Sequence, residues 1–293
     1  MTKFKNPALM LALSMLVFGT IAPFVEMTGL ASGEVALYRA VMGALLIAVF
    51  LLVTRQKIPF KQIKKQIPLL MISGGAMGFN WILLFEAYKY CASKAVATLC
   101  YYFAPVIVTL VCPILFKEKM TLKAWICFVM STLGLALITG IGRVGDYIGI
   151  VFGIGAAVLY ASVVLLNKYI KGVDGIHRTF LQFIAAIVVL IPYVAFTDGF
   201  NFTTLDTKGL TALLVIGFVH TGITYCVYFS TISMLSGQKA SILSYIDPLV
   251  AVIISVAYLK EPMEWYQWVG GALILGFTLL NEIKFKKTIA NSK

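Results

Sequence analysis

Ten apolar runs of about 20 residues follow one another along the chain, separated by short polar connectors. A helix of about that length crosses the hydrocarbon core of a bilayer. Because backbone groups in lipid must hydrogen-bond within their own segment, runs of this kind fold as helices. We therefore predict an all-α membrane protein with ten transmembrane helices, at residues 8–25, 35–53, 67–87, 95–116, 122–141, 147–166, 179–196, 210–230, 240–259 and 266–280.

The composition agrees with a lipid environment. Hydrophobic residues make up 60% of the chain and charged residues 12%, against about 45–50% and about 25% in soluble domains. The net charge of +12 is spread over short loops and forms no basic face, so we expect no nucleic-acid partner. The five cysteines lack metal-ligand spacing, and we expect neither a metal nor a cofactor. The first run is longer than the core of a usual signal peptide, so we interpret it as a retained span.

One stretch of the sequence occurs twice. Pro105 lies inside an apolar run and precedes Glu118 by thirteen residues, and Pro248 precedes Glu261 by the same interval. Each glutamate follows a lysine just past its run. A repeated pattern of this kind indicates an internal duplication.

The duplication divides the chain into two five-span repeats, residues 1–144 and 145–293. Because five is odd, the second repeat enters the membrane inverted relative to the first. Inverted repeats are typical of secondary transporters, whose halves exchange conformations around a site near the membrane midplane.

The distribution of basic residues predicts the orientation. With the N-terminus in the cytoplasm, eighteen of the 24 Lys and Arg residues fall on the cytoplasmic side and five on the other, with Arg39 inside a span. Cytoplasmic loops are normally richer in Lys and Arg. We expect the protein to lie in the inner or plasma membrane of the cell. Both of its termini are expected to face the cytoplasm.

These features resemble a known family. The two-by-five plan, the Lys-Glu after spans four and nine, the Asp247-Pro248 pair, and the pattern of Gly78, Phe85, Ala87 and Tyr90 are similar to the EamA branch of the drug/metabolite transporter superfamily. The resemblance implies transport of amino acids, other metabolites or toxic compounds, often outward. One departure is Phe18-Gly19 in the first span, where the family often has tryptophan before the glycine.

Ionisable side chains deep in a membrane are costly and mark candidate functional residues. His220 lies about halfway along span eight, and Asp247 about eight residues into span nine. We expect both to face one cavity, where either could take up a proton or pair with a cationic substrate group. The alternative is structural, with His220 bonded to backbone and Asp247 capping carbonyls loosened beside Pro248.

A second candidate group lies nearer the outer face. Arg39 is about one turn inside span two, and Glu86 ends span three on the same side. Together they could form an outer gate, or Arg39 could bind a substrate carboxylate. Alternatively, Arg39 extends to the outer headgroups.

The resemblance places further polar and aromatic side chains around a central cavity, although each taken singly suits ordinary packing. They are Asn80, Trp81, Tyr101, Tyr102, Tyr225, Tyr228 and Tyr245. Glu118 and Glu261 are expected to be structural, tying spans four and nine to their neighbours. Pro105 and Pro248 are expected to interrupt helical hydrogen bonding in the same spans.

The sequence therefore favours a secondary transporter, monomeric or homodimeric, for a small molecule driven by a proton or counter-solute gradient. A membrane enzyme would need a concentrated catalytic constellation, and the pore of a channel or receptor would need rows of like polar residues. Neither is evident. The phosphate-binding motif of ATP-driven pumps is also missing from the sequence.

Overall fold

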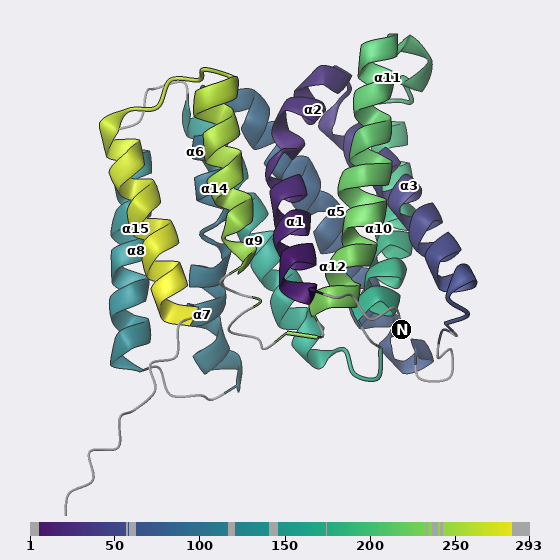
Figure 1. The fold of residues 1–293 in the computed structure, drawn as a ribbon, viewed down its shortest axis with the longest axis horizontal. Coiled ribbons are helices and arrows are strands. Elements are labelled where there is room, and N and C mark those ends of the chain that lie inside the picture. The colour runs from purple at the N-terminus through teal and green to yellow at the C-terminus, as the bar shows by residue number, and fades with distance from the viewer. Residues whose placement is uncertain are drawn as a thin grey trace, which may run out of the picture.

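The computed structural model describes residues 6–56, 58, 63–116, 121–140, 146–173, 175–232, 234–235, 240 and 243–282. These residues form helices and connecting turns, without a β-strand among them (Figure 1). The predicted all-α fold is confirmed.

The helices follow the predicted spans closely. The first repeat contains α1 (Pro7–Gly19), α2 (Ile21–Thr28), α3 (Ser32–Val53), η1 (Lys64–Gln66), α5 (Ile67–Tyr90), α6 (Lys94–Tyr101), α7 (Ala104–Phe116) and α8 (Leu122–Gly140). The second contains α9 (Tyr147–Tyr169), α10 (Gly175–Thr197), η3 (Phe202–Thr204), α11 (Thr207–Leu214), η4 (Val215–Ile223), α12 (Thr224–Ile232), α14 (Ile246–Ile253), η5 (Ile254–Tyr258) and α15 (Trp265–Glu282).

Seven helical stretches of the described chain are long and apolar enough to cross a membrane. The apolar helices Leu122–Ile138 and Ile246–Tyr258 are shorter. The count of ten spans therefore remains a prediction, although every predicted span overlaps one or more helices of the described residues.

Two of the predicted spans are broken near the duplicated prolines. Pro105 lies at the second position of α7, and Pro248 at the third position of α14. The predicted interruption is present in both spans, and the helix after each break begins at Ala104, one residue before Pro105, and at Ile246, two residues before Pro248. A proline is tolerated in a first turn, where its missing N–H has no intrahelical partner.

The repeats adopt the same backbone at the two breaks. Tyr102 has φ −71° and ψ 6°, and Tyr245, which precedes Pro248 as Tyr102 precedes Pro105, has φ −74° and ψ −7°. The duplication seen in sequence thus reproduces a local conformation.

The middle of span eight is a π-helix, η4. The Oγ1 of Thr221 donates to the carbonyl of Ile216 at 2.8 Å, five residues earlier. The Oγ1 of Thr224 donates in the same way to the carbonyl of Val219 at 2.7 Å. Both hydroxyls therefore reach carbonyls five residues earlier, the spacing of the wider π-helical turn. Such turns frequently occur at functional sites.

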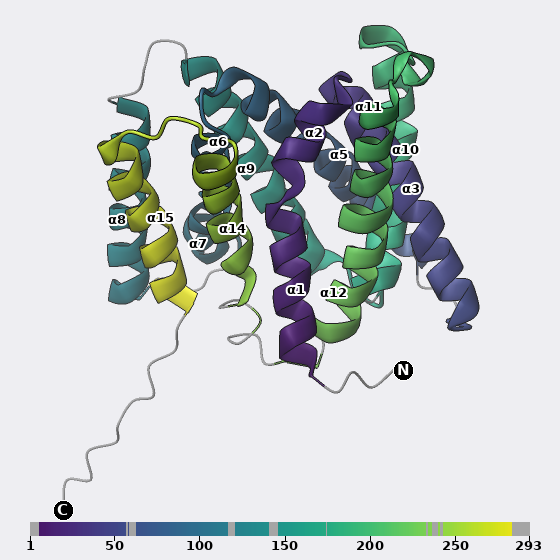
Figure 2. The same ribbon diagram turned by 45° about the horizontal axis from the view of Figure 1, so that its top comes forward.

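The bundle has two groups of helices, visible in both ribbon views. One contains α6, α8, α14 and α15, and the other contains α3, α10, α11 and α12 (Figures 1 and 2). The first two helices cross the bundle between these groups: α1 packs on α12 and α14, and α2 on α11 and η4.

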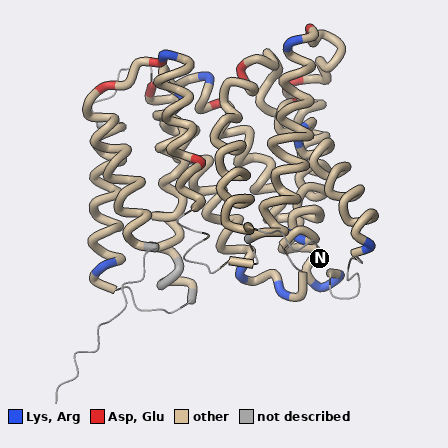
Figure 3. Tube along the Cα trace, viewed as in Figure 1, with Lys and Arg blue, Asp and Glu red and all other residues tan. Residues whose placement is uncertain are grey.

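The two ends of the bundle differ in charge. The described Lys and Arg residues concentrate at the end where α1 begins and α15 ends, here called the lower end (Figure 3). Asp and Glu gather at the opposite, upper end.

Candidate functional site

A cavity of about 1500 Å³ lies in the interior of the bundle. It is lined by nine of the predicted site residues: Arg39, Trp81, Tyr101, Tyr102, Pro105, Tyr225, Tyr228, Tyr245 and Asp247. It also reaches Gln56 after α3, Asn167 near the end of α9 and Arg178 near the start of α10. Since these residues lie at the lower end, the cavity extends to that end of the bundle.

Arg39 is buried in the wall of this cavity, with 4% of its surface exposed. Its Nε donates to Thr221 Oγ1 at 3.2 Å. The guanidinium carbon lies 4.4 Å from the ring centroid of Trp81 and 5.6 Å from that of Phe85. Such cation–π contacts favour a desolvated cation. Arg39 therefore does not extend to the headgroups, and in the described part of the chain it makes no ion pair with a carboxylate.

The expected contact between Arg39 and Glu86 is absent among the described residues. Glu86 instead accepts from Lys89 Nζ at 3.1 Å, one turn further along α5. Neighbours at this spacing meet on the surface of one helix. In this conformation the Glu86 side chain is 23% exposed and paired within α5, whereas Arg39 lies against Thr221 and aromatic rings.

Asp247 lines the cavity from the first turn of α14. Its Oδ2 accepts a hydrogen bond from the hydroxyl of Tyr102, which directly follows α6 in the other repeat. Tyr101 packs its ring against Tyr102, with centroids 5.6 Å apart, and against Tyr160, at 5.4 Å. The breaks in spans four and nine thus bring a carboxylate and several tyrosines together.

His220 does not line the cavity, so the predicted site shared with Asp247 is wrong for this residue. Its ring is 2% exposed and directed toward the junction of α1 and α2. There Nε2 lies 3.0 Å from Thr20 Oγ1, and Nδ1 lies 3.3 Å from the carbonyl of Val215. These contacts match the structural alternative.

Asn80 is also outside the cavity lining. Its Nδ2 donates to the carbonyl of Ala156 at 2.6 Å and ties α5 to α9. A buried amide needs such a partner, which explains a polar residue at this depth. The prediction of a cavity contact is corrected here too.

Of the two repeated glutamates, Glu261 is described and Glu118 lies outside the described residues. Glu261 accepts from the backbone N–H of Lys94 at 2.7 Å and from its Nζ at 2.5 Å. It therefore ties the end of span nine to the start of span four.

Several aromatic cavity residues were not predicted, among them Phe18, Tyr88 and Tyr160. Phe18 packs edge-on against Tyr225 with centroids 5.1 Å apart, so an aromatic contact is kept where the family often has tryptophan.

Comparison with known proteins assigns the family. The model of the EamA-like transporter family matches residues 5–140 and again residues 147–282. The chain belongs to the EamA-like transporter family. It is a membrane transporter, and the resemblance read from the sequence is confirmed.

Relatives of this EamA-like transporter include the uncharacterized transporter YxxF of Bacillus subtilis, 29% identical over 97% of this chain and 92% of the relative. An uncharacterized transporter of Archaeoglobus fulgidus is 26% identical over 92% and 94%. A solved structure described only as a crystal structure of a protein has a TM-score of 0.65 at 17% identity, covering 94% of this chain and 96% of its own. This last likeness supports the fold alone.

Proposed function

We propose that this transporter is a secondary active carrier that exports or exchanges a small organic metabolite, an amino acid or a related amine, by alternating access between its two repeats. The supporting observation is that Arg39 and Asp247 line one cavity, and neither has an oppositely charged partner among the described residues. A desolvated charge in a membrane is costly unless something compensates it. A solute carrying a carboxylate and an ammonium group compensates both.

The chemistry of each side chain suits one end of such a solute. An arginine guanidinium binds a carboxylate through two parallel hydrogen bonds, and Thr221 and the Trp81 ring hold this one in place. Asp247, oriented by the Tyr102 hydroxyl, accepts an ammonium group. The tyrosine rings between them pack against the apolar part of the solute.

The shape of the cavity favours loading from the cytoplasm. The positive-inside rule assigns the basic lower end to the cytoplasm, and with it both termini. Because the cavity reaches that end, this conformation receives solute from inside the cell, as an exporter requires. A proton or a counter-solute supplies the energy, with Asp247 as the proton acceptor.

The test is transport by the purified protein in liposomes. Labelled amino acids, amines and nucleosides are offered one class at a time, with and without an imposed pH gradient. Net movement of amino acids or amines that grows with the gradient supports the proposal. Movement of nucleosides alone, or of no class, contradicts it.

Two variants separate the roles of the charges. Arg39→Gln should raise KM for amino acids and leave KM for amines without a carboxylate unchanged. Asp247→Asn should abolish transport of both classes together with its dependence on the gradient. Lys208→Gln, which removes an exposed cation from α11, is the control. If Arg39→Gln reduces transport of amino acids and of simple amines equally, the contact between Arg39 and a substrate carboxylate is ruled out.

A further inference from the structure

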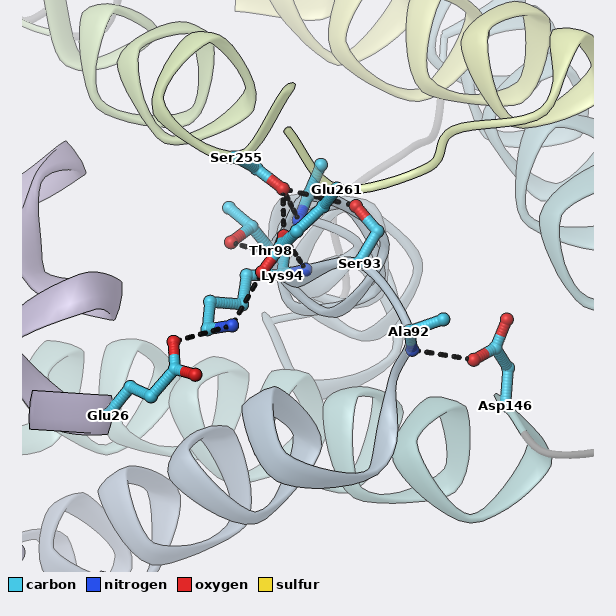
Figure 4. A network of polar contacts seen from close by, with 9 residues as sticks. Glu26, Ala92, Ser93, Lys94, Thr98, Asp146, Ser255 and Glu261 are labelled. Atoms are coloured by element: carbon cyan, nitrogen blue, oxygen red, sulfur yellow. Dashed lines mark hydrogen bonds and ion pairs between the residues drawn. The ribbon is translucent and has the colours of Figure 1, made fainter. Parts of the chain in front are cut away.

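Lys94, the first residue of α6, contacts two carboxylates from two other elements (Figure 4). Its Nζ lies 2.5 Å from Oε1 of Glu261, which follows η5, and 3.0 Å from Oε2 of Glu26 in α2. The side chain of Lys94 is 12% exposed. A nearly buried ammonium is thus shared between two acids.

The two carboxylates hold Lys94 in different ways. The Glu261 side chain is 11% exposed and also accepts from the backbone N–H of Lys94 and from the hydroxyl of Ser255. Ser255 in turn accepts from the N–H of Ala95 at 3.0 Å. A carboxylate fixed at a helix N-terminus is favourable, so Glu261 anchors Lys94 firmly. Glu26, by contrast, is 63% exposed.

Only one of these contacts joins the two groups of helices. The anchor between Lys94 and Glu261 lies within one group, since α6 packs against α14 and η5. The contact between Lys94 and Glu26 joins that group to α2, which packs against α11 of the other group and against η4. Figure 2 shows α2 at the upper end, between α6 and α11.

This contact lies beyond the closed end of the cavity. Thr98, one turn into α6, donates to the carbonyl of Lys94 and lines the cavity. On the opposite side, Ile21 at the start of α2 also lines it. Neither Lys94 nor Glu26 belongs to the lining. The ion pair therefore closes over the upper end, away from the lower end that the cavity reaches.

We infer that the ion pair between Glu26 and Lys94 is the outer gate of the transporter. It forms when the upper end is closed and breaks when α2 and α6 separate, while Glu261 keeps Lys94 in place through the cycle. Partly exposed ion pairs contribute little to stability, so this one can break and re-form repeatedly. The inference rests on the proposed alternating access and adds the residues that control its outer side.

The test measures access to the cavity from the upper side. Thr98→Cys is introduced into the full-length chain in right-side-out vesicles and labelled with a membrane-impermeant maleimide. The same proteins without Thr98→Cys give the background from native cysteines. Glu26→Gln should speed labelling by about threefold, the shift expected from loss of one partly exposed ion pair. High salt should speed labelling of the parent and have less effect on Glu26→Gln.

Glu86→Gln provides the matched control. It removes a second ion pair near the upper end, but one formed within α5 with Lys89. Unchanged labelling in Glu86→Gln supports the gate, whereas an equal rise in both variants overturns it. Glu261→Gln should lower thermal stability as well as speed labelling, because it releases the anchor. An unchanged rate in Glu26→Gln also overturns the gate.

The labelling and transport results can fail separately. If amino acids or amines are transported and the labelling rate is the same with and without Glu26→Gln, the gate is wrong and the proposed function stands. If labelling responds to Glu26 and no amino acid or amine moves, the gate stands and the proposed substrate class is wrong.

Discussion

The packing of α5 on α10 makes a sharp prediction, because two neighbouring glycines of α5 face different surroundings. A Cβ added at Gly74 would overlap the backbone carbonyl of Gln182 and lie 2.5 Å from Ala185 Cβ. A Cβ added at Gly75 would lie 3.7 Å from Val189 Cγ2, an ordinary contact. Substitution by alanine should therefore push α5 and α10 apart at Gly74 and fill available space at Gly75.

The expected magnitude follows from these contacts. Both substitutions gain the same helix propensity, about 1 kcal/mol for alanine over glycine. This gain cancels when the two variants are compared. What remains is the overpacking cost at Gly74, where the nearest obstacles are a carbonyl and a Cβ that no rotamer change can move. Overpacking of this kind costs about 1–3 kcal/mol.

The assay is reversible unfolding of both variants in the same detergent mixture, followed by helical circular dichroism. Gly74→Ala should be about 1–3 kcal/mol less stable than Gly75→Ala. It should also transport more slowly, since Gln182 lines the cavity. Equal stability of the two variants would refute the close packing of α5 on α10.

Three further predictions concern single side chains. Asn80→Ala should cost about 1–3 kcal/mol of unfolding free energy in the same assay, because the Ala156 carbonyl loses its amide donor; a neutral result would deny that this bond exists. Burial raises the pKa of the Cys91 thiol to about 12, so a maleimide at neutral pH should label Cys91 only after unfolding, as mass spectrometry can show. Tyr102→Phe removes the donor to Asp247 and should raise KM for amines more than it lowers kcat in liposomes, whereas an unchanged KM would argue against this contact in the loaded state.

Much of the fold could be predicted because a bilayer leaves few alternatives. Apolar runs of spanning length have to be helices, and each predicted run coincides with helical residues. The break between α1 and α2 was missed, since Gly19 and Thr20 are compatible with a continuous apolar helix. Its cause is tertiary: Thr20 contacts His220, and a Cβ at Gly19 would lie 2.5 Å from the carbonyl of Asp247.

The site was only partly predictable, because tertiary contacts also decide which side chains face the cavity. Depth along a span can be counted from sequence, but the direction of a side chain around a helix depends on the local turn. His220 and Asp247 were both placed at depth, yet His220 lies in a π-helix that directs it toward Thr20. Lys94 directly precedes the predicted span at residues 95–116, and only the fold brings Glu26 and Glu261 to it.

The duplicated prolines explain why the polar residues of the cavity lie where they do. A helix cannot normally break inside a membrane, because the freed backbone groups would face hydrocarbon. In this protein Tyr102 and Tyr245, at the two breaks, line a cavity, and the backbone N–H groups of Tyr102 and Phe103 donate to the carbonyls of Thr98 at 2.9 Å and Cys100 at 3.2 Å. Pro105 and Pro248 lack the N–H that a first helical turn leaves unpaired, which reduces the cost of each break. A duplicated helix break therefore gives each repeat a polar position in the cavity, and the second repeat places Asp247 at its break.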